Sequence, residues 1–126
     1  MKLVVIDDEP DVVDLIRYYF QQKGVEVITY TDSVKAKGEM CRINPDVIIT
    51  DWMMPELNGK ELLKSIKDDN KISTTPVIML SCISDFSSIS NLFRIGLDDY
   101  VMKPVNMKKL YDIVIDHYNS SKARLN

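Results

Sequence analysis

The chain has 126 residues, of which 45% are hydrophobic and 28% are charged. This length and composition are typical of one globular domain and argue against two domains of ordinary size. Sixteen Lys and Arg residues against nineteen Asp and Glu residues give a net charge of −3, which argues against direct nucleic-acid binding through a basic surface. No apolar run approaches the roughly 20 residues of a membrane span. The two cysteines, Cys41 and Cys82, lack metal-ligand spacing, so we expect a reduced, cytoplasmic protein.

Five short apolar runs recur along the chain and are expected to be β-strands. They are Leu3–Ile6, Val25–Ile28, Val47–Ile49, Val77–Leu80 and Tyr100–Met102. The first four are rich in Val and Ile and nearly continuous, which is typical of strands covered on both faces in a parallel sheet.

Segments with helical spacing separate these runs. We expect helices from Pro10 toward Gly24, over Val34–Ile43, behind Asn58, from about Asp85 to Ile95, and from near Asn106 onward. The apolar face of the first is formed by Val12, Leu15, Ile16, Tyr19 and Phe20. The second has Val34, Met40 and Ile43 on its apolar face and is interrupted by Gly38. Strands that alternate with helices predict a single doubly wound α/β domain with a five-stranded parallel sheet. We place this domain at residues 1–119, followed by a frayed polar tail at residues 120–126.

Three acidic residues follow the predicted strands directly. Asp7 and Asp8 come after the first strand, and Asp51 comes after the third. In an open α/β sheet the functional crevice lies beyond the carboxyl ends of the strands, where the strand order reverses. A single acid at such a place is more often a helix cap, but three at one crevice repel one another unless a cation is bound. Oxygen ligands without His or Cys favour Mg²⁺ or Mn²⁺.

Two further polar residues follow later strands. Ser81 comes after the fourth strand and Lys103 after the fifth. Taken alone, either is an ordinary cap or surface residue. A carboxylate nucleophile, a divalent cation, a hydroxyl and an ammonium group at one crevice together form a site for a phosphoryl group, whose oxygens they hold as charge develops.

Four segments carry a family resemblance: VVIDDEP, IITDWMMPELNG, VIMLSC and GLDDYVMKP. They resemble the signature segments of the receiver domain of a bacterial two-component response regulator. The resemblance covers the chain from Lys2 to about Tyr118. It implies a flavodoxin-like sheet with strand order 2-1-3-4-5 and a phosphoacceptor signalling domain that catalyses only its own phosphorylation and dephosphorylation.

The resemblance also implies a role for each residue of the crevice. Asp51 would accept a phosphoryl group from a sensor histidine kinase or a histidine phosphotransfer protein. Asp8 and Asp51 would bind Mg²⁺ directly, Asp7 would bind it through water, and the backbone carbonyl of Met53 would complete the protein ligands. The phosphoryl oxygens would be held by Ser81 and Lys103.

The same resemblance makes Ser81 and Tyr100 the switch residues. Tyr100 would move inward when the hydroxyl of Ser81 shifts toward the phosphoryl group, and the conformational change would control an output partner or domain. In this family the residues two positions after the phosphoacceptor and after the hydroxyl residue flank the path of the hydrolytic water. Here they are Met53 and Ile83, which cannot orient water, so we expect a long-lived phosphorylated state.

The last predicted helix has a wide apolar arc. Tyr111, Ile115 and Tyr118 extend it along one edge, which either packs under a neighbouring helix or joins Ile89 and Tyr100 in a surface of the fourth helix, fifth strand and fifth helix. In the second case the surface would support a phosphorylation-dependent homodimer.

Other readings of the crevice are less well supported. A phosphatase with an aspartyl nucleophile would use an acid where Met53 stands, and a flavin-binding domain would not place DDEPD at the phosphate. No GxxxxGK[ST] motif is present for a P-loop. A degenerate receiver would lack an acid or the lysine. Whether the chain is a stand-alone receiver or the first domain of a longer regulator stays open.

Overall fold

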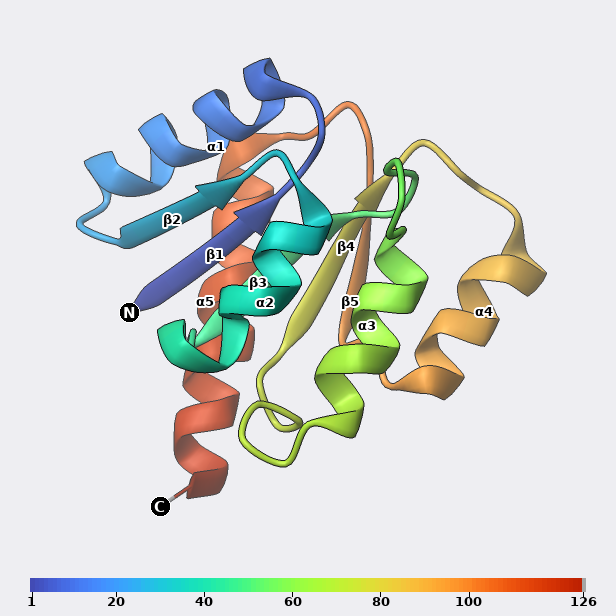
Figure 1. Ribbon diagram of the computed structural model, residues 1–126. Helices are drawn as coiled ribbons and strands as arrows, with labels where there is room; N and C mark the ends of the chain where they lie inside the picture. The colour runs from blue at the N-terminus through green and yellow to red at the C-terminus, as the bar shows by residue number, and fades with distance from the viewer. Residues whose placement is uncertain (126) are drawn as a thin grey trace.

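The Val- and Ile-rich runs form one parallel sheet in the computed structural model, which describes residues 1–125 (Figure 1). The strands are β1 (Lys2–Ile6), β2 (Glu26–Tyr30), β3 (Val47–Asp51), β4 (Val77–Ser81) and β5 (Asp99–Met102), in the spatial order β2-β1-β3-β4-β5. Strand order therefore reverses between β1 and β3, where a doubly wound fold has its crevice. The predicted fold class and strand order are confirmed.

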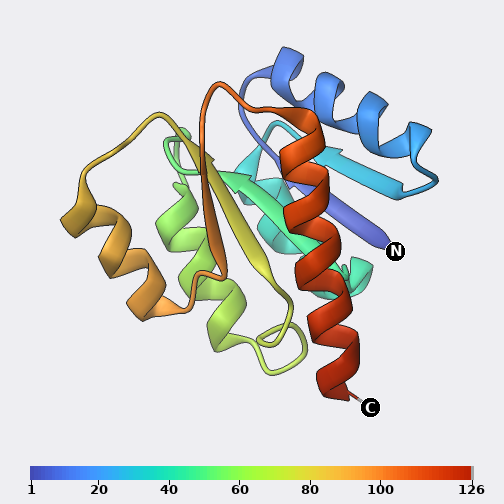
Figure 2. The ribbon, with the colours of Figure 1, turned by 180° about the vertical axis from the view of Figure 1, so that it is seen from behind.

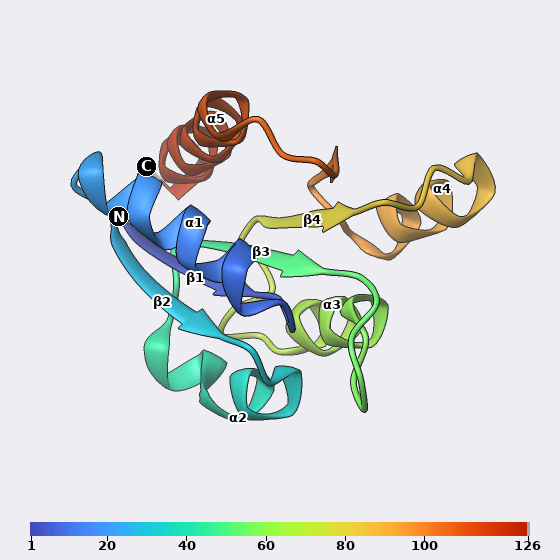
Figure 3. The same ribbon diagram turned by 90° about the horizontal axis from the view of Figure 1, so that it is seen from above.

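Helices cover both faces of the sheet. They are α1 (Pro10–Gln22), α2 (Ser33–Ile43), α3 (Gly59–Asp68), α4 (Phe86–Ile95) and α5 (Met107–Leu125). Figure 2 shows α1 and α5 together on one side, and Figure 3 shows α2 and α3 on the opposite side of the sheet. No described helix is both long enough and apolar enough to cross a membrane.

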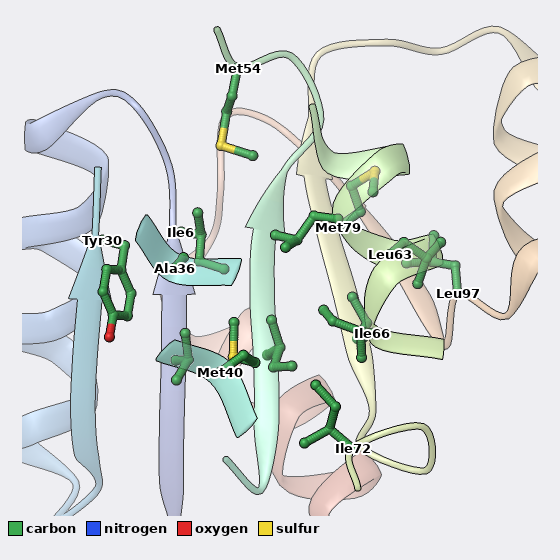
Figure 4. Close-up of a cluster of buried hydrophobic side chains, with 14 of the residues drawn as sticks. Ile6, Tyr30, Ala36, Met40, Met54, Leu63, Ile66, Ile72, Met79 and Leu97 are labelled. Atoms are coloured by element: carbon green, nitrogen blue, oxygen red, sulfur yellow. The ribbon is translucent and has the colours of Figure 1, made fainter. Parts of the chain in front are cut away.

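Alternation along the strands divides the interior into two cores. Val4 and Ile6 pack with residues of α2, α3 and α4, whereas Leu3 and Val5 pack with residues of α1 and α5. Figure 4 shows the first core, where side chains of α2 and α3 meet the sheet. All four strand residues are fully buried, as expected for a parallel strand covered on both faces.

Side-chain caps start four of the helices, including α5, where Asn106 Oδ1 accepts from the Lys109 N–H. The carboxylate of Asp32 accepts from two backbone N–H groups of α2, and Asp85 caps α4. Asn58 and Glu61 form a reciprocal capping box at the start of α3. These caps satisfy N–H groups that have no partner within their helices and fix where the loops at the carboxyl edge of the sheet enter the helices.

Three details of the sequence prediction are wrong. Leu15 is 54% exposed and Val34 is 48% exposed, because the buried stripe of α1 is centred on Ile16, one third of a turn away from Leu15, and α2 turns Val34 outward. Gly38 does not interrupt α2, which is continuous. Separately, α5 is helical as far as Leu125, and residue 126 of the expected tail lies outside the described residues. The domain limits remain a prediction.

Candidate functional site

The carboxyl ends of four strands bring the predicted polar residues together. Asp51 ends β3 and Ser81 ends β4, while Asp7 and Lys103 follow β1 and β5 directly. Because β1 pairs with β3, β3 with β4 and β4 with β5, all four residues lie at one edge of the sheet. The expected convergence is present in the structure.

Three carboxylates form the acidic part of this site. Asp7, Asp8 and Asp51 each place one oxygen within 4.8 Å of the others. Asp7 and Asp51 are buried, and Asp8 is exposed. Burial and the charge of Asp7 raise the pKa of Asp51 to about 6, against the lowering effects of Lys103 and the Trp52 N–H. A bound cation would relieve this repulsion, and the hard oxygen donors fit Mg²⁺ or Mn²⁺.

A single ammonium group faces these acids. Lys103 Nζ lies 2.9 Å from Asp7 Oδ2, 3.4 Å from Glu9 Oε1 and 3.5 Å from Asp51 Oδ2. Burial by itself would lower the pKa of Lys103, but the hydrogen bond and charge of Asp7, with the charges of Asp51 and Glu9, raise it above its usual range. The ammonium is therefore charged and stands beside the oxygen of Asp51 that faces it. The peptide bond from Lys103 to Pro104 is cis.

A cavity of about 380 Å³ opens over Asp51. Its lining residues are Asp8, Glu9, Asp51, Met53, Ser81, Cys82, Ile83 and Lys103. Ser81 is buried, and its Oγ accepts a hydrogen bond from the Ile83 N–H at 3.2 Å. The Met53 side chain is 63% exposed at the rim. The cavity thus presents the carboxylates of Asp8, Glu9 and Asp51 together with one hydroxyl and one ammonium group.

Backbone contacts fix the orientation of Asp51. The Trp52 N–H donates to Asp51 Oδ1 at 2.8 Å, so Oδ2 is the oxygen directed toward Lys103. The Gly59 N–H donates to the Trp52 carbonyl at 2.7 Å. The N–H and the carbonyl of Trp52 are thereby both hydrogen-bonded, which orients the Asp51 carboxylate before any ligand arrives.

Gly59 is a positioning residue that sequence reasoning missed. A Cβ atom there would stand 2.2 Å from the Asp51 carbonyl oxygen and 2.9 Å from the Trp52 Cα, so only glycine allows α3 to begin against the end of β3. The signal was visible as the glycine after the N-cap Asn58, eight residues beyond Asp51, but its use depends on a tertiary contact.

Tyr100 lies in an inward position. Its side chain packs against the core that contains Trp52, and the two rings are T-shaped with centroids 6.1 Å apart. The Tyr100 hydroxyl donates to the Ile83 carbonyl at 2.6 Å. Tyr100 is thus joined to the segment that follows Ser81.

Part of the wide apolar arc of α5 packs under a neighbouring helix. Tyr111 packs against Tyr19 and Phe20 of α1, and Tyr118 packs against the same core. For these tyrosines the structure supports the first of the two alternatives, packing under a neighbouring helix, and not the outer surface. The α5 residues beside Tyr100 and Met102 are instead Lys109 and Ile113, which line a shared groove with them.

The fold and the site together define a class of protein: doubly wound domains that receive a phosphoryl group at the carboxyl edge of the sheet. Residues 3–115 match the family model of the response regulator receiver domain. The chain belongs to this family. It is a receiver domain of two-component signalling, a phosphoacceptor and not a conventional enzyme.

Individual relatives agree with the family. The chain is 29% identical over 120 residues to the chemotaxis protein CheY1 of Helicobacter pylori, with 91% of this chain and 97% of the relative covered. It is 27% identical over 109 residues to the DNA-binding dual master transcriptional regulator RpaA of Synechocystis, with 86% of this chain covered. The chain spans only 45% of the length of that regulator.

A solved structure shows the same architecture. The receiver domain of the Francisella response regulator 1452 superposes with a TM-score of 0.88 at 32% sequence identity, covering 95% of this chain and 98% of the other. The described residues therefore share the fold of that receiver domain.

Proposed function

We propose that Asp51 is the phosphoacceptor of this receiver domain and that Ser81 and Lys103 hold the phosphoryl oxygens. The observation that carries the proposal is the orientation of Asp51, whose Oδ1 accepts from the Trp52 N–H while Oδ2 lies 3.5 Å from Lys103 Nζ at the cavity. Ser81 lines the same cavity. A phosphoryl group bonded to Asp51 in this cavity would therefore have the hydroxyl and the ammonium group available to its oxygens.

The chemistry follows from these positions. An oxygen of the Asp51 carboxylate forms a bond to the phosphorus of a phosphohistidine, while the bond from phosphorus to the imidazole nitrogen breaks and its electron pair stays on the imidazole. The charge of Lys103 and the hydroxyl of Ser81 stabilise the oxygens of the transferring group. Because the pKa of Asp51 is raised to about 6, the carboxylate is mostly ionised at pH 7 and able to attack.

Asp7, Asp8, Asp51 and the Met53 carbonyl are the proposed ligands of Mg²⁺ or Mn²⁺, with Asp7 acting through water. The cluster of three carboxylates supports this assignment. When bound, the cation supplies positive charge for the phosphoryl oxygens. It also offsets the mutual repulsion of the acids, which Lys103 alone balances only in part.

Covalent labelling tests the proposal. Incubation with Mg²⁺ and acetyl phosphate should add one phosphoryl group, labile to base and hydroxylamine, as measured by intact mass. Asp51→Asn should abolish the addition, whereas Ser81→Ala and Lys103→Ala should slow it or uncouple it from the conformational change. Asp46→Asn, which changes an aspartate at the other end of the sheet, is the matched control. Wild-type labelling of Asp51→Asn would disprove the assignment.

A receiver domain implies a histidine kinase as a partner. A sensor kinase or a histidine phosphotransfer protein as the direct donor, and a cytoplasmic location, remain our proposals. Surface side chains of the receiver determine which donor it recognises. The donor is therefore identified by the rate of phosphoryl transfer from purified, phosphorylated candidate proteins. Equal rates from unrelated donors would argue against a dedicated partner.

We also propose that the phosphorylated state is long-lived. Met53 and Ile83 line the cavity over Asp51, and neither side chain can orient an attacking water molecule. Replacing Met53 with Asn and Ile83 with Glu should therefore shorten the lifetime of the phosphoryl group, measured as loss of the added mass after the donor is removed. An unchanged or longer lifetime would contradict this idea.

A phosphorylation-dependent homodimer through α4, β5 and α5 is a further proposal. Phe86 and Phe93 of α4 and Met102 of β5 are 84%, 45% and 44% exposed, and an interface through these elements would bury them. Phe93→Glu should prevent association in the presence of Mg²⁺ and beryllofluoride and leave the melting temperature unchanged, as followed by sedimentation. Sedimentation of the wild type as a monomer with beryllofluoride would contradict the proposal.

A further inference from the structure

Trp52, the only tryptophan of the chain, connects Asp51 with Tyr100. Trp52 follows Asp51 directly, and 8% of its surface is exposed. Its N–H donates to Asp51 Oδ1, and its carbonyl accepts from the Gly59 N–H. The backbone of Trp52 is therefore held by hydrogen bonds, and the ring is restricted by its burial in the core.

The ring meets Tyr100 at a defined angle. The two ring planes make an angle of 84° with their centroids 6.1 Å apart, an edge-to-face arrangement that is favourable beyond simple burial. Tyr100 is in turn anchored by its hydroxyl on the Ile83 carbonyl, and the Ile83 N–H donates to Ser81 Oγ. These contacts form a continuous path from Asp51 through Trp52 and Tyr100 to Ser81, the other residue at the phosphoryl position.

We propose that the indole ring of Trp52 positions Tyr100, holding it in the inward place that the phosphorylated state requires. This inference rests on the proposed function and on the expectation from the sequence that Ser81 and Tyr100 are the switch residues. Trp52 is a positioning residue: its ring does not line the cavity over Asp51, and it acts through Tyr100. The phosphoacceptor is thus linked to Tyr100 both through Ser81 and through the residue next to it in the chain.

The thermodynamic consequence is measurable. If Trp52 favours inward Tyr100, and a phosphoryl group favours inward Tyr100, each must strengthen the other by the same factor. Removal of the ring should weaken binding of beryllofluoride, a phosphoryl mimic, with Mg²⁺. An edge-to-face pair contributes enough for a change of about two- to tenfold in affinity.

A double-mutant cycle tests the inference. Beryllofluoride affinity in Mg²⁺ is measured by ¹⁹F NMR for the wild type, Trp52→Leu, Tyr100→Ala and the double variant. Trp52→Leu should lose affinity in the wild-type background and have no further effect when Tyr100 is absent. Phe20→Leu is the control, because Phe20 is a fully buried ring on the other face of the sheet and its loss should leave the affinity unchanged. If Trp52→Leu does not fold, Trp52→Phe replaces it, because the smaller ring cannot reach Tyr100 in the same way.

The outcomes separate the two proposals. An equal loss of affinity with and without Tyr100 would mean that Trp52 acts on Asp51 directly, and an unchanged affinity would mean that it does not act at all; either overturns the inference. Absence of beryllofluoride binding by the wild type would instead contradict the proposed function itself. Acetyl phosphate should still label Trp52→Leu on Asp51, since the backbone N–H that orients the carboxylate is retained.

Discussion

Charged groups are paired at the amino end of the sheet, whereas acidic groups are in excess at the carboxyl end. At the amino end, Lys67 Nζ is surrounded by the Ser73 and Thr75 carbonyls and the Asp98 carboxylate, and Asp98 Oδ2 also accepts from the Val77 N–H. Lys67 and Asp98 thus form an ion pair in which each group also has a hydrogen bond to the backbone. At the carboxyl end, four acids share a single lysine.

This difference in pairing distinguishes charges that stabilise the fold from charges that bind a ligand. A charge with matched partners holds elements together, and its removal leaves the partner uncompensated. An excess of one sign costs stability until a ligand of the other sign arrives. The amino end therefore joins α3 to the start of β4 and β5, and the carboxyl end is prepared for a cation and a phosphoryl group. Three predictions test this comparison, from the largest expected effect to the smallest.

Magnesium should stabilise the protein through the carboxyl end alone. At 100 times its Kd, a ligand that binds only the native state adds about 2.7 kcal/mol to the free energy of unfolding. Asp8→Asn should reduce this gain and raise the stability of the metal-free protein, because it removes one of the repelling charges. Asp46→Asn, at the amino end, should leave the gain unchanged. Thermal unfolding with Mg²⁺ or a chelator measures both, and equal responses of the two variants would contradict the comparison.

Loss of Lys67, at the amino end of the sheet, should lower the stability of the protein, whereas loss of Asp8 at the carboxyl end should raise it. Lys67 and Asp98 have side chains that are 18% and 25% exposed, so Lys67→Met should cost about 2 kcal/mol, less than a fully buried pair. The affinity for beryllofluoride should stay the same. Lys64→Met, at an exposed position of the same helix, should change the stability little. Denaturant unfolding of the two variants checks this prediction, and equal stabilities would disprove it.

Stability without metal should fall as the pH rises through the titration of Asp51. The pKa of Asp51 is raised from 3.8 to about 6 in the folded state, chiefly by burial and by Asp7, so the native state binds the proton more tightly than the unfolded chain. The contribution is present below about pH 4 and is lost by about pH 6, a change of roughly 1–2 kcal/mol. Asp51→Asn should lack this loss. Urea unfolding in chelator at several pH values measures it, and parallel profiles for the two proteins would rule it out.

Much of this molecule is readable from local sequence. The strands are apolar on both faces and separated by amphipathic segments, so their type and order along the chain follow from composition and spacing. The convergence of Asp7, Asp51, Ser81 and Lys103 also follows, because parallel strands bring their carboxyl ends to one edge. The acids were recognisable because each stands directly after a strand.

The features that the sequence did not predict depend on how each helix is rotated about its axis and on contacts between distant segments. The exposure of Leu15 and the direction of Tyr111 are set by how α1 and α5 turn against each other, which a helical pattern with several apolar residues leaves undecided. The position of Gly59 against Asp51 and the meeting of Trp52 with Tyr100 require the tertiary fold. No spacing rule connects residues 48 positions apart, as Trp52 and Tyr100 are.

The close contact of Gly59 with the end of β3 also limits which residues this position tolerates. Of two glycines near helices, Gly38 has no heavy atom within 4 Å of a Cβ built on it, whereas Gly59 would meet the backbone of Asp51 and Trp52. Gly38→Ala should therefore be accepted and stabilise α2 by about 1 kcal/mol, while a library at Gly59 selected for phosphorylation should return glycine alone. A residue that has no side chain and takes no part in the chemistry should thus be as restricted in sequence as the phosphoacceptor itself.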